Sequence, residues 1–207
     1  MRFVPKWVLL SSGSVSSGSA PALLIGGWSG AALFEGSAYD PATQTISVLG
    51  AYGAAGYWVM TTAFLALGVC HLLTAWGLRA AATAGRVALG GGGVAAFAVA
   101  LLPAPSSGGS LRHGAVAVVG FTLLAVWPLL AVDGGAAAPW ALRPAPAVAV
   151  CVLMAAGGAW FLFEMQRHGN AGVAERVVTF FQSAWPFVVA VSCLRHVRRP
   201  APPPLPD

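Results

Sequence analysis

The chain has 207 residues, of which 57% are hydrophobic and only 8% are charged, and its mean hydropathy is +0.77. Soluble domains carry about 25% charged residues, so this chain has too few charges to cover a surface that faces water. The composition excludes a soluble globular domain and predicts an all-α integral membrane protein. The net charge of +5 is spread over the ends of apolar segments rather than gathered in a basic domain, so we expect no nucleic-acid partner.

Six apolar segments have the length that a membrane span requires. A bilayer core of about 30 Å needs roughly 20 residues of helix. The backbone finds no water there, so its polar groups must be satisfied within a helix. We therefore predict a polytopic bundle of six transmembrane helices, near residues 7–34, 58–78, 87–102, 115–132, 145–165 and 177–194.

The positive charges indicate how the chain crosses the membrane. With six spans, eight of the 11 Lys and Arg residues lie on the side of the two termini and three lie on the other side. Lys and Arg are enriched in cytoplasmic loops, so both termini are predicted to be cytoplasmic. The eight are Arg2, Lys6, Arg79, Arg86, Arg143, Arg195, Arg198 and Arg199, and the three are Arg112, Arg167 and Arg176.

The two ends of the chain carry further expectations. Arg2 and Lys6 precede a short apolar run, and residues 19–22 are small enough for cleavage of a signal peptide. The apolar run of residues 7–10 is too short for a signal sequence, so we favour one continuous first span. We expect one domain over residues 1–199, multi-pass in the cell membrane, and a disordered Pro-rich tail over residues 200–207.

Chemically active side chains concentrate on the side opposite the termini. The first outer connection, residues 35–57, holds all three tyrosines, and Asp40 stands before Pro41 in a turn signature. Ser47 follows in the same connection. The other outer segments contribute Arg112 and His113, then Glu164, Arg167 and His168, and finally Glu175 and Arg176.

The spacing of these residues predicts a polar vestibule at the outer end of the bundle. Glu164, Arg167 and His168 stand at i, i+3 and i+4, so one helical face presents all three. Polar groups inside lipid normally face the bundle or a wet cavity. We expect the vestibule to involve Tyr39, Asp40, Ser47, Arg112, His113, Glu164, Arg167, His168, Glu175 and Arg176. Within it, we expect Glu175 to pair with His113 and leave Arg176 for Asp40 or an anionic head group.

Other interpretations of the same residues stay open. They are also consistent with ordinary interfacial ion pairs that hold the loops together. A metal site is disfavoured because no two histidines stand at i and i+4, and we predict neither a metal nor a cofactor. Nucleophilic catalysis would recruit Ser47 with His113 as its base, although no nucleophile elbow surrounds this serine. His71, in the second span, is expected to be hydrogen-bonded within the bundle.

Three segments of the chain, taken in order, have a familiar pattern. They are YDPATQTISVLGA in the first outer connection, Pro103 followed by RHGAVAVVGF at the entrance to the fourth span, and GVAERVVTFFQSAW in the sixth. Together they resemble the bacterial membrane family catalogued as domain of unknown function 998. The resemblance implies a six-helix bundle and gives added weight to six residues: Tyr39, Pro41, Ser47, His113, Glu175 and Arg176. It implies no reaction.

Two classes of function fit these observations. In the first, the protein is an uncharacterised membrane protein whose outer vestibule binds a lipid head group or a small amphiphile. In the second, it is an intramembrane hydrolase or transferase that acts on a lipid-linked substrate, with His113 and Glu175 as acid-base groups. A transporter is a third class, and it would need charged or broken helices at the midplane, where this sequence has almost no charge.

Overall fold

The computed structural model describes residues 6–105, 109–135 and 138–198, and it is helical with no strand in those ranges. The expected Pro-rich tail lies outside the described residues. The described ranges contain six long helices and three short ones, in chain order: α1 Lys6–Ala32, η1 Gly36–Ala38, α2 Ile46–Leu49, α3 Tyr57–Gly77, α4 Thr83–Leu101, α5 Leu111–Leu130, η2 Trp140–Leu142, α6 Pro144–Gln166 and α7 Ala171–Val197.

Within the described residues, five helices are long and apolar enough to cross a membrane, namely α3, α4, α5, α6 and α7. Helix α1 has 27 residues but is less apolar, because serine and glycine dominate residues 11–19. The helices extend past several of the predicted apolar boundaries. For example, α7 begins at Ala171, six residues before the predicted span, since the polar first turns of a helix can lie in the interfacial region.

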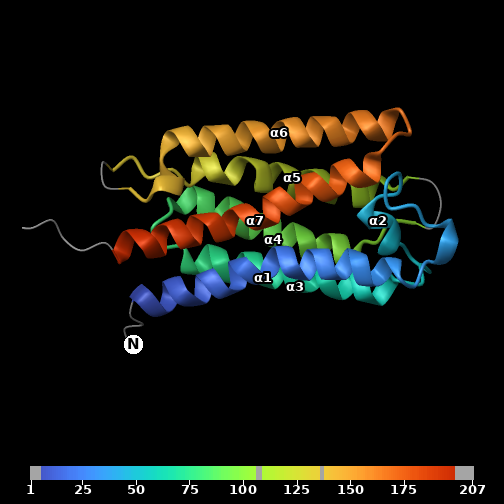
Figure 1. Cartoon of the computed structure of the whole chain (residues 1–207), viewed down its shortest axis with the longest axis horizontal. Helices are drawn as coiled ribbons and strands as arrows, with labels where there is room; N and C mark the ends of the chain where they lie inside the picture. Colours follow the sequence, from blue (N-terminus) through green and yellow to red (C-terminus); the bar gives the residue numbers. More distant parts are fainter. Residues whose placement is uncertain (1–5, 106–108, 136–137, 199–207) are drawn as a thin grey trace, which may run out of the picture.

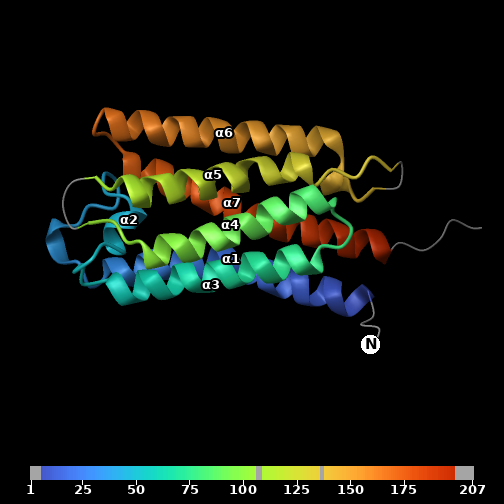
Figure 2. The ribbon, with the colours of Figure 1, turned by 180° about the vertical axis from the view of Figure 1, so that it is seen from behind.

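The long helices of the described part pack side by side in a closed order (Figures 1 and 2). Helix α1 lies against α3, and α3 against α4, followed by α5, α6 and α7, which returns to α1. Both described chain ends, the start of α1 and the end of α7, lie at the same end of the bundle (Figure 1). The first connection and the short helix α2 lie at the opposite end, which we call the loop end.

Small residues allow the helices to approach closely. A Cβ atom added to Gly68 of α3 would lie 2.8 Å from the backbone oxygen of Gly93 in α4, and one added to Gly93 would lie 2.9 Å from the oxygen of Gly68. Such backbone contact is the main source of helix association in lipid, where apolar side chains gain little from burial against one another. The glycine run of residues 90–93 therefore serves helix packing.

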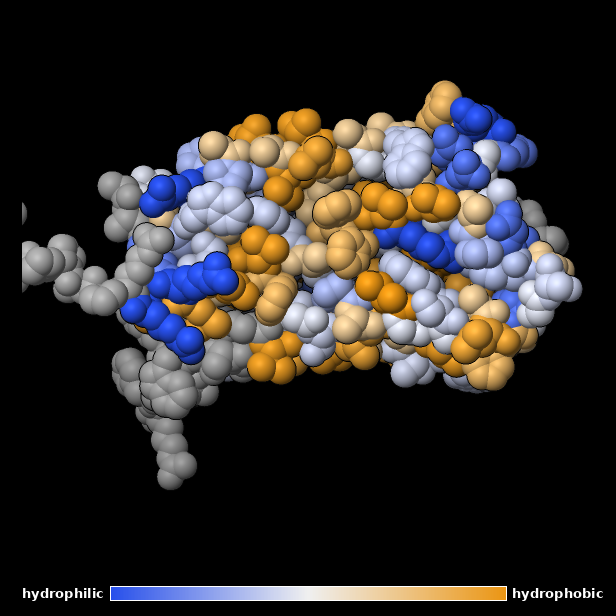
Figure 3. All heavy atoms as spheres, viewed as in Figure 1, coloured by the Kyte–Doolittle hydropathy of each residue, from blue (hydrophilic) through white to orange (hydrophobic). Residues whose placement is uncertain are grey.

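The outside of the bundle is apolar along its length. Large side chains such as Leu153 and Leu162 point outward, 70% and 56% exposed. Figure 3 shows apolar residues over the middle of one face and hydrophilic residues gathered mainly toward the two ends. A surface of this kind is suited to hydrocarbon rather than water, which is consistent with the five described helices that are long and apolar enough to cross a membrane.

Candidate functional site

The loop end of the bundle brings together three connections that are far apart in sequence. The first connection, residues 33–56, passes over the start of α7 and carries α2 toward the middle of the bundle. The start of α5 and the turn between α6 and α7 lie at the same end. The helix order therefore explains how α2, the start of α5 and the start of α7 come to lie side by side.

Glu175 attaches α2 to α7. Its side chain is 5% exposed, and its carboxyl oxygen accepts a hydrogen bond from the backbone N–H of Ile46. Ile46 is itself buried beneath the connection. Because Ile46 is the first residue of α2, this bond fixes where the short helix lies and which way Ser47, its second residue, is presented.

Arg176 fastens the preceding part of the same connection. Its guanidinium donates to the carbonyl oxygens of Pro41 and Gln44, at 2.9 Å and 3.1 Å, and to the phenol oxygen of Tyr39. A further bond reaches the carbonyl of Gly172 in its own helix, at 2.9 Å. We expected Arg176 to be free for Asp40 or a head group. Instead, its guanidinium is occupied by these bonds and holds the first connection against α7.

Two groups in this connection have shifted pKa values. Burial raises the pKa of the Tyr39 phenol above its ordinary value, and the adjacent Arg176 guanidinium opposes that rise. The Asp40 carboxylate accepts bonds from the Ala42 N–H and the Thr43 hydroxyl, at 2.9 Å and 2.8 Å. These bonds, the Ala42 N–H first, lower the pKa of Asp40. Asp40 is exposed and stabilises its own turn.

His113 joins three segments through its ring. It lies in the first turn of α5 and is 9% exposed. Its Nδ1 is 2.8 Å from the carbonyl oxygen of Leu102, and its Nε2 is 3.0 Å from Ser47 Oγ. A carbonyl oxygen only accepts, so Nδ1 carries a hydrogen. In the neutral ring, Nε2 is then unprotonated and accepts the hydroxyl proton of Ser47.

Ser47 lies against the imidazole of His113 and lines the same space as Glu175. Its Oγ is 3.0 Å from His113 Nε2, and Ser47 and Glu175 line one cavity. Our expectation of a direct pair between Glu175 and His113 is wrong for the described residues. Glu175 accepts from the Ile46 N–H, and the two ring nitrogens of His113 contact Leu102 and Ser47.

An apolar cavity of about 80 Å³ begins at Ser47 and Glu175. Four long helices and α2 contribute to it, and its polar groups lie at the loop end and along α7. Small residues of α4 and α5 make the space, because larger side chains there would fill it. It is lined by Ile46, Ser47, Phe64, Leu67, Gly92, Ala95, Ala96, Val99, Ala117, Gly120, Phe121, Leu124, Glu175, Thr179 and Gln182. We call it the groove.

The remaining residues of the expected vestibule lie apart from this cluster. Glu164 is buried and stabilises the turn between α6 and α7, accepting from the Asn170 N–H at 2.7 Å and the Trp160 indole at 3.3 Å. Arg167, whose side chain is exposed, forms an ion pair with Glu164 at 3.7 Å. His168 is exposed with a φ of 54° in the same turn, and Arg112 is exposed at the start of α5.

Some parts of the site carry no signal in the sequence. The carbonyl of Leu102 and the N–H of Ile46 are backbone groups, so any residue type at these positions provides them. The polar residues Thr179 and Gln182 were detectable, since they continue a polar stripe from Glu175 at helical spacing. Gln182 is buried and donates to the carbonyl of Phe121 at 3.0 Å, which closes one side of the groove.

His71 lies outside this site. It is 1% exposed in α3, and neither of its ring nitrogens has a hydrogen-bond partner among the described residues. The expected hydrogen-bonded role is therefore wrong for the described part of the chain. A Cβ added to Gly93 of α4 would lie 3.2 Å from the Cβ of His71, so His71 belongs to the same close contact between α3 and α4.

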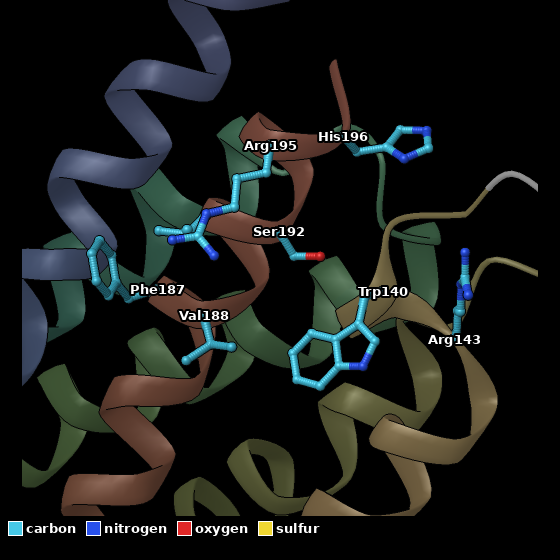
Figure 4. A pocket seen from close by; sticks show the side chains of 8 residues that line it. Trp140, Arg143, Phe187, Val188, Ser192, Arg195 and His196 are labelled. Carbon is cyan, nitrogen blue, oxygen red and sulfur yellow. The ribbon is translucent and has the colours of Figure 1, made fainter. Parts of the chain in front are cut away.

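A second cavity, of about 480 Å³, lies at the end of the bundle that holds the chain ends (Figure 4). It is formed by the last part of α7 and by η2, and it contains two arginines, a histidine and apolar side chains. Figure 4 shows Arg195 on the side of Phe187 and Val188, and Trp140 and Arg143 across from them. Its basic and apolar lining suits the interface of a membrane, and no acidic side chain lines it.

The chain was compared with known proteins. Searches of curated proteins and of solved structures gave no match. The model of the family described as "Protein of unknown function (DUF998)" matches residues 19–192, a range that includes Ser47, His113 and Glu175. This match covers most of the chain and confirms the resemblance that the loop-end segments indicated. The chain therefore belongs to this family of proteins of unknown function.

Proposed function

We propose that this protein is a six-span protein of the cell membrane, with both termini in the cytoplasm, that binds an acyl chain of a lipid or small amphiphile in the groove. The polar end of the ligand would lie near Ser47, His113 and Glu175, at the outer leaflet. The observation that carries the proposal is the groove itself, an apolar space that ends at a buried carboxyl and a serine-histidine pair.

The size of the groove suits part of a chain. A cavity needs about 10–15 Å³ on this measure to hold one water-sized group, so about 80 Å³ holds roughly five to eight such groups. A methylene is of similar size. The groove therefore fits a segment of one acyl chain, and apolar lining with few polar groups at one end is typical of sites for amphiphilic ligands.

A photoactivatable fatty acid with a diazirine on its chain tests this proposal. The purified protein in nanodiscs is irradiated with the probe, and the labelled peptides are located by mass spectrometry. We expect labels on residues that line the groove. The substitution Ala117→Phe should fill the groove and reduce labelling at least tenfold, whereas Val118→Phe, on the adjacent residue that is 58% exposed, should not. Equal labelling of the two variants would contradict the proposal.

The proposed orientation is tested separately. In a variant whose three native cysteines are replaced, a cysteine at Ala38 should react with a membrane-impermeant maleimide added to intact cells. A cysteine at Ala82, at the opposite end of the bundle, should react only after the cells are opened. The reverse pattern would show that the termini face outward.

The second candidate is an enzyme that acts on a lipid-linked substrate. The hydrogen bond between Ser47 and His113 supports this candidate, because a serine paired with an unprotonated ring nitrogen is the arrangement that activates a nucleophile.

A further inference from the structure

The surroundings of Ser47 differ from those of three other serines whose hydrogen bonds are known, namely Ser110, Ser183 and Ser192. Ser183 donates to the carbonyl of Phe180 in its own helix at 3.0 Å. Ser110 caps α5 by accepting from a backbone N–H, and Ser192 accepts from the N–H of Ala141. Only Ser47 among these four lies against an imidazole nitrogen and also lines an apolar cavity.

Two hydrogen bonds fix the position of His113. The bond from Nδ1 to the Leu102 carbonyl, 2.8 Å long, fixes the ring orientation and the position of its hydrogen. The backbone N–H of His113 is bound by Ser110 at 3.2 Å, so the residue is anchored at both ends. A neutral ring held in this way presents the lone pair of Nε2 to the Ser47 hydroxyl, as a general base must.

We infer that Ser47 is the nucleophile of an acyl-transfer reaction, with His113 as its base, and that the substrate is an acyl ester of a lipid whose chain occupies the groove. This inference rests on the proposed function for the substrate class. The groove sets that class, because it is apolar and Ser47 lines it, so the carbonyl end of a bound chain would lie beside the Ser47 hydroxyl.

The reaction proceeds by two transfers in which all protons are accounted for. Ser47 Oγ attacks the ester carbonyl carbon as its proton passes to His113 Nε2, which gives a tetrahedral intermediate. The intermediate collapses, the ester C–O bond breaks, and the leaving alcohol takes the proton from Nε2. Water or a second alcohol then attacks the acyl-serine, gives its proton to Nε2 and releases Ser47, which takes that proton back.

Glu175 acts as a positioning residue in this scheme. It accepts a hydrogen bond from the N–H of Ile46, the residue before Ser47, and so fixes where the Ser47 hydroxyl lies. The Leu102 carbonyl takes the place at Nδ1 that a carboxylate occupies in a serine-histidine-aspartate triad. The two ring nitrogens of His113 bind Leu102 and Ser47, so Glu175 does not orient the imidazole directly.

A long-chain alkyl fluorophosphonate with a terminal alkyne tests the inference. It reacts with an activated serine: the Oγ–P bond forms, the P–F bond breaks, and the serine proton passes to the base as fluoride leaves. The full-length protein in nanodiscs should be labelled on the peptide that contains Ser47. Ser47→Ala should abolish labelling, while Ser183→Ala, a change at a buried serine bound to its own helix, should leave it unchanged.

The base is identified by two further variants. His113→Gln should slow labelling by about 100-fold or more, the usual contribution of a general base. Glu175→Gln retains an oxygen for the Ile46 N–H and should slow it less than tenfold. If Glu175→Gln abolishes labelling and His113→Gln does not, His113 is not the base and the inference is overturned.

Labelling with the diazirine fatty acid separates this inference from the proposed function. If the groove is photolabelled but no fluorophosphonate, long or short, reacts at Ser47, the nucleophile is wrong and the binding site stands. If an ethyl fluorophosphonate labels Ser47 in a His113-dependent manner and the groove is never photolabelled, the nucleophile stands and the binding site is wrong.

Discussion

Arg176 is the main attachment of the first outer connection, and Arg176→Gln should release that connection. Three of its four hydrogen bonds reach the connection, at Tyr39, Pro41 and Gln44. Glutamine is shorter and uncharged, so it can replace at most one of them. With about 1 kcal/mol for each bond from a half-buried donor, the loss is roughly 2–3 kcal/mol. That value corresponds to a roughly 30- to 150-fold increase in the undocked fraction.

Hydrogen exchange followed by mass spectrometry measures this release. We expect amides in residues 40–49 to exchange roughly 30- to 150-fold faster in Arg176→Gln, in line with that free energy, while amides in the centres of α3 and α4 stay protected. Arg167→Gln is the matched control. Its side chain is 59% exposed and pairs only at 3.7 Å, and exposed pairs contribute about 0–1 kcal/mol. Exchange that matches wild type in Arg176→Gln, or that rises throughout the bundle, would refute the reasoning.

Three further predictions concern packing and pH. Gly93→Ala should destabilise the bundle by about 1–3 kcal/mol, the usual cost of overpacking, because its Cβ would lie 2.9 Å from a backbone oxygen. Gly26→Ala should not destabilise it, because the Cβ there would meet nothing within 4 Å. Thermal unfolding in detergent compares the stability of the two variants. The pKa of Asp40 is lowered in the folded state, so its stabilisation of the turn is present above its ordinary pKa of 3.8 and is lost as the pH falls through the folded value. Amide exchange in residues 40–44 should therefore gain an acid-dependent component that Asp40→Asn lacks. Burial raises the pKa of Tyr39 above its ordinary value of 10.0. In a titration of tyrosine absorbance, the change that Tyr39→Phe removes should therefore be centred above pH 10. A change centred below that pH would contradict this assignment.

The helices themselves were predictable from the sequence. An apolar segment long enough to cross a bilayer predicts a helix whatever its individual residues are. The helices α3, α4, α5, α6 and α7 all occur at such segments. Helix α1 was less certain because its first half is rich in serine. Its place beside α3 depends on buried bonds such as Ser16 Oγ to Thr74 Oγ1, at 3.1 Å, which no hydropathy pattern contains.

The candidate site was only partly predictable. The sequence places Ser47, His113 and Glu175 at one end of the bundle, but only the helix order decides which of them meet. The position of Ser47 beside His113 follows from where Glu175 holds the N–H of Ile46, a contact between residues 129 positions apart. The charged residues are poor guides to the site, because a charge at an interface needs only a nearby partner. Asp40, Glu164 and Arg167 each find that partner within their own turn rather than in the site.

The contact between Gly68 and Gly93 has a consequence for how the bundle assembles in the bilayer. Helices in lipid form first as independent spans and associate afterwards. Association at two glycines orders no side-chain rotamers, and only residues 78–82 separate α3 from α4, so closing this loop costs little entropy. The α3–α4 hairpin should therefore associate early in assembly. The walls that α3 and α4 contribute to the groove would then exist before α5 and α7 arrive to complete it.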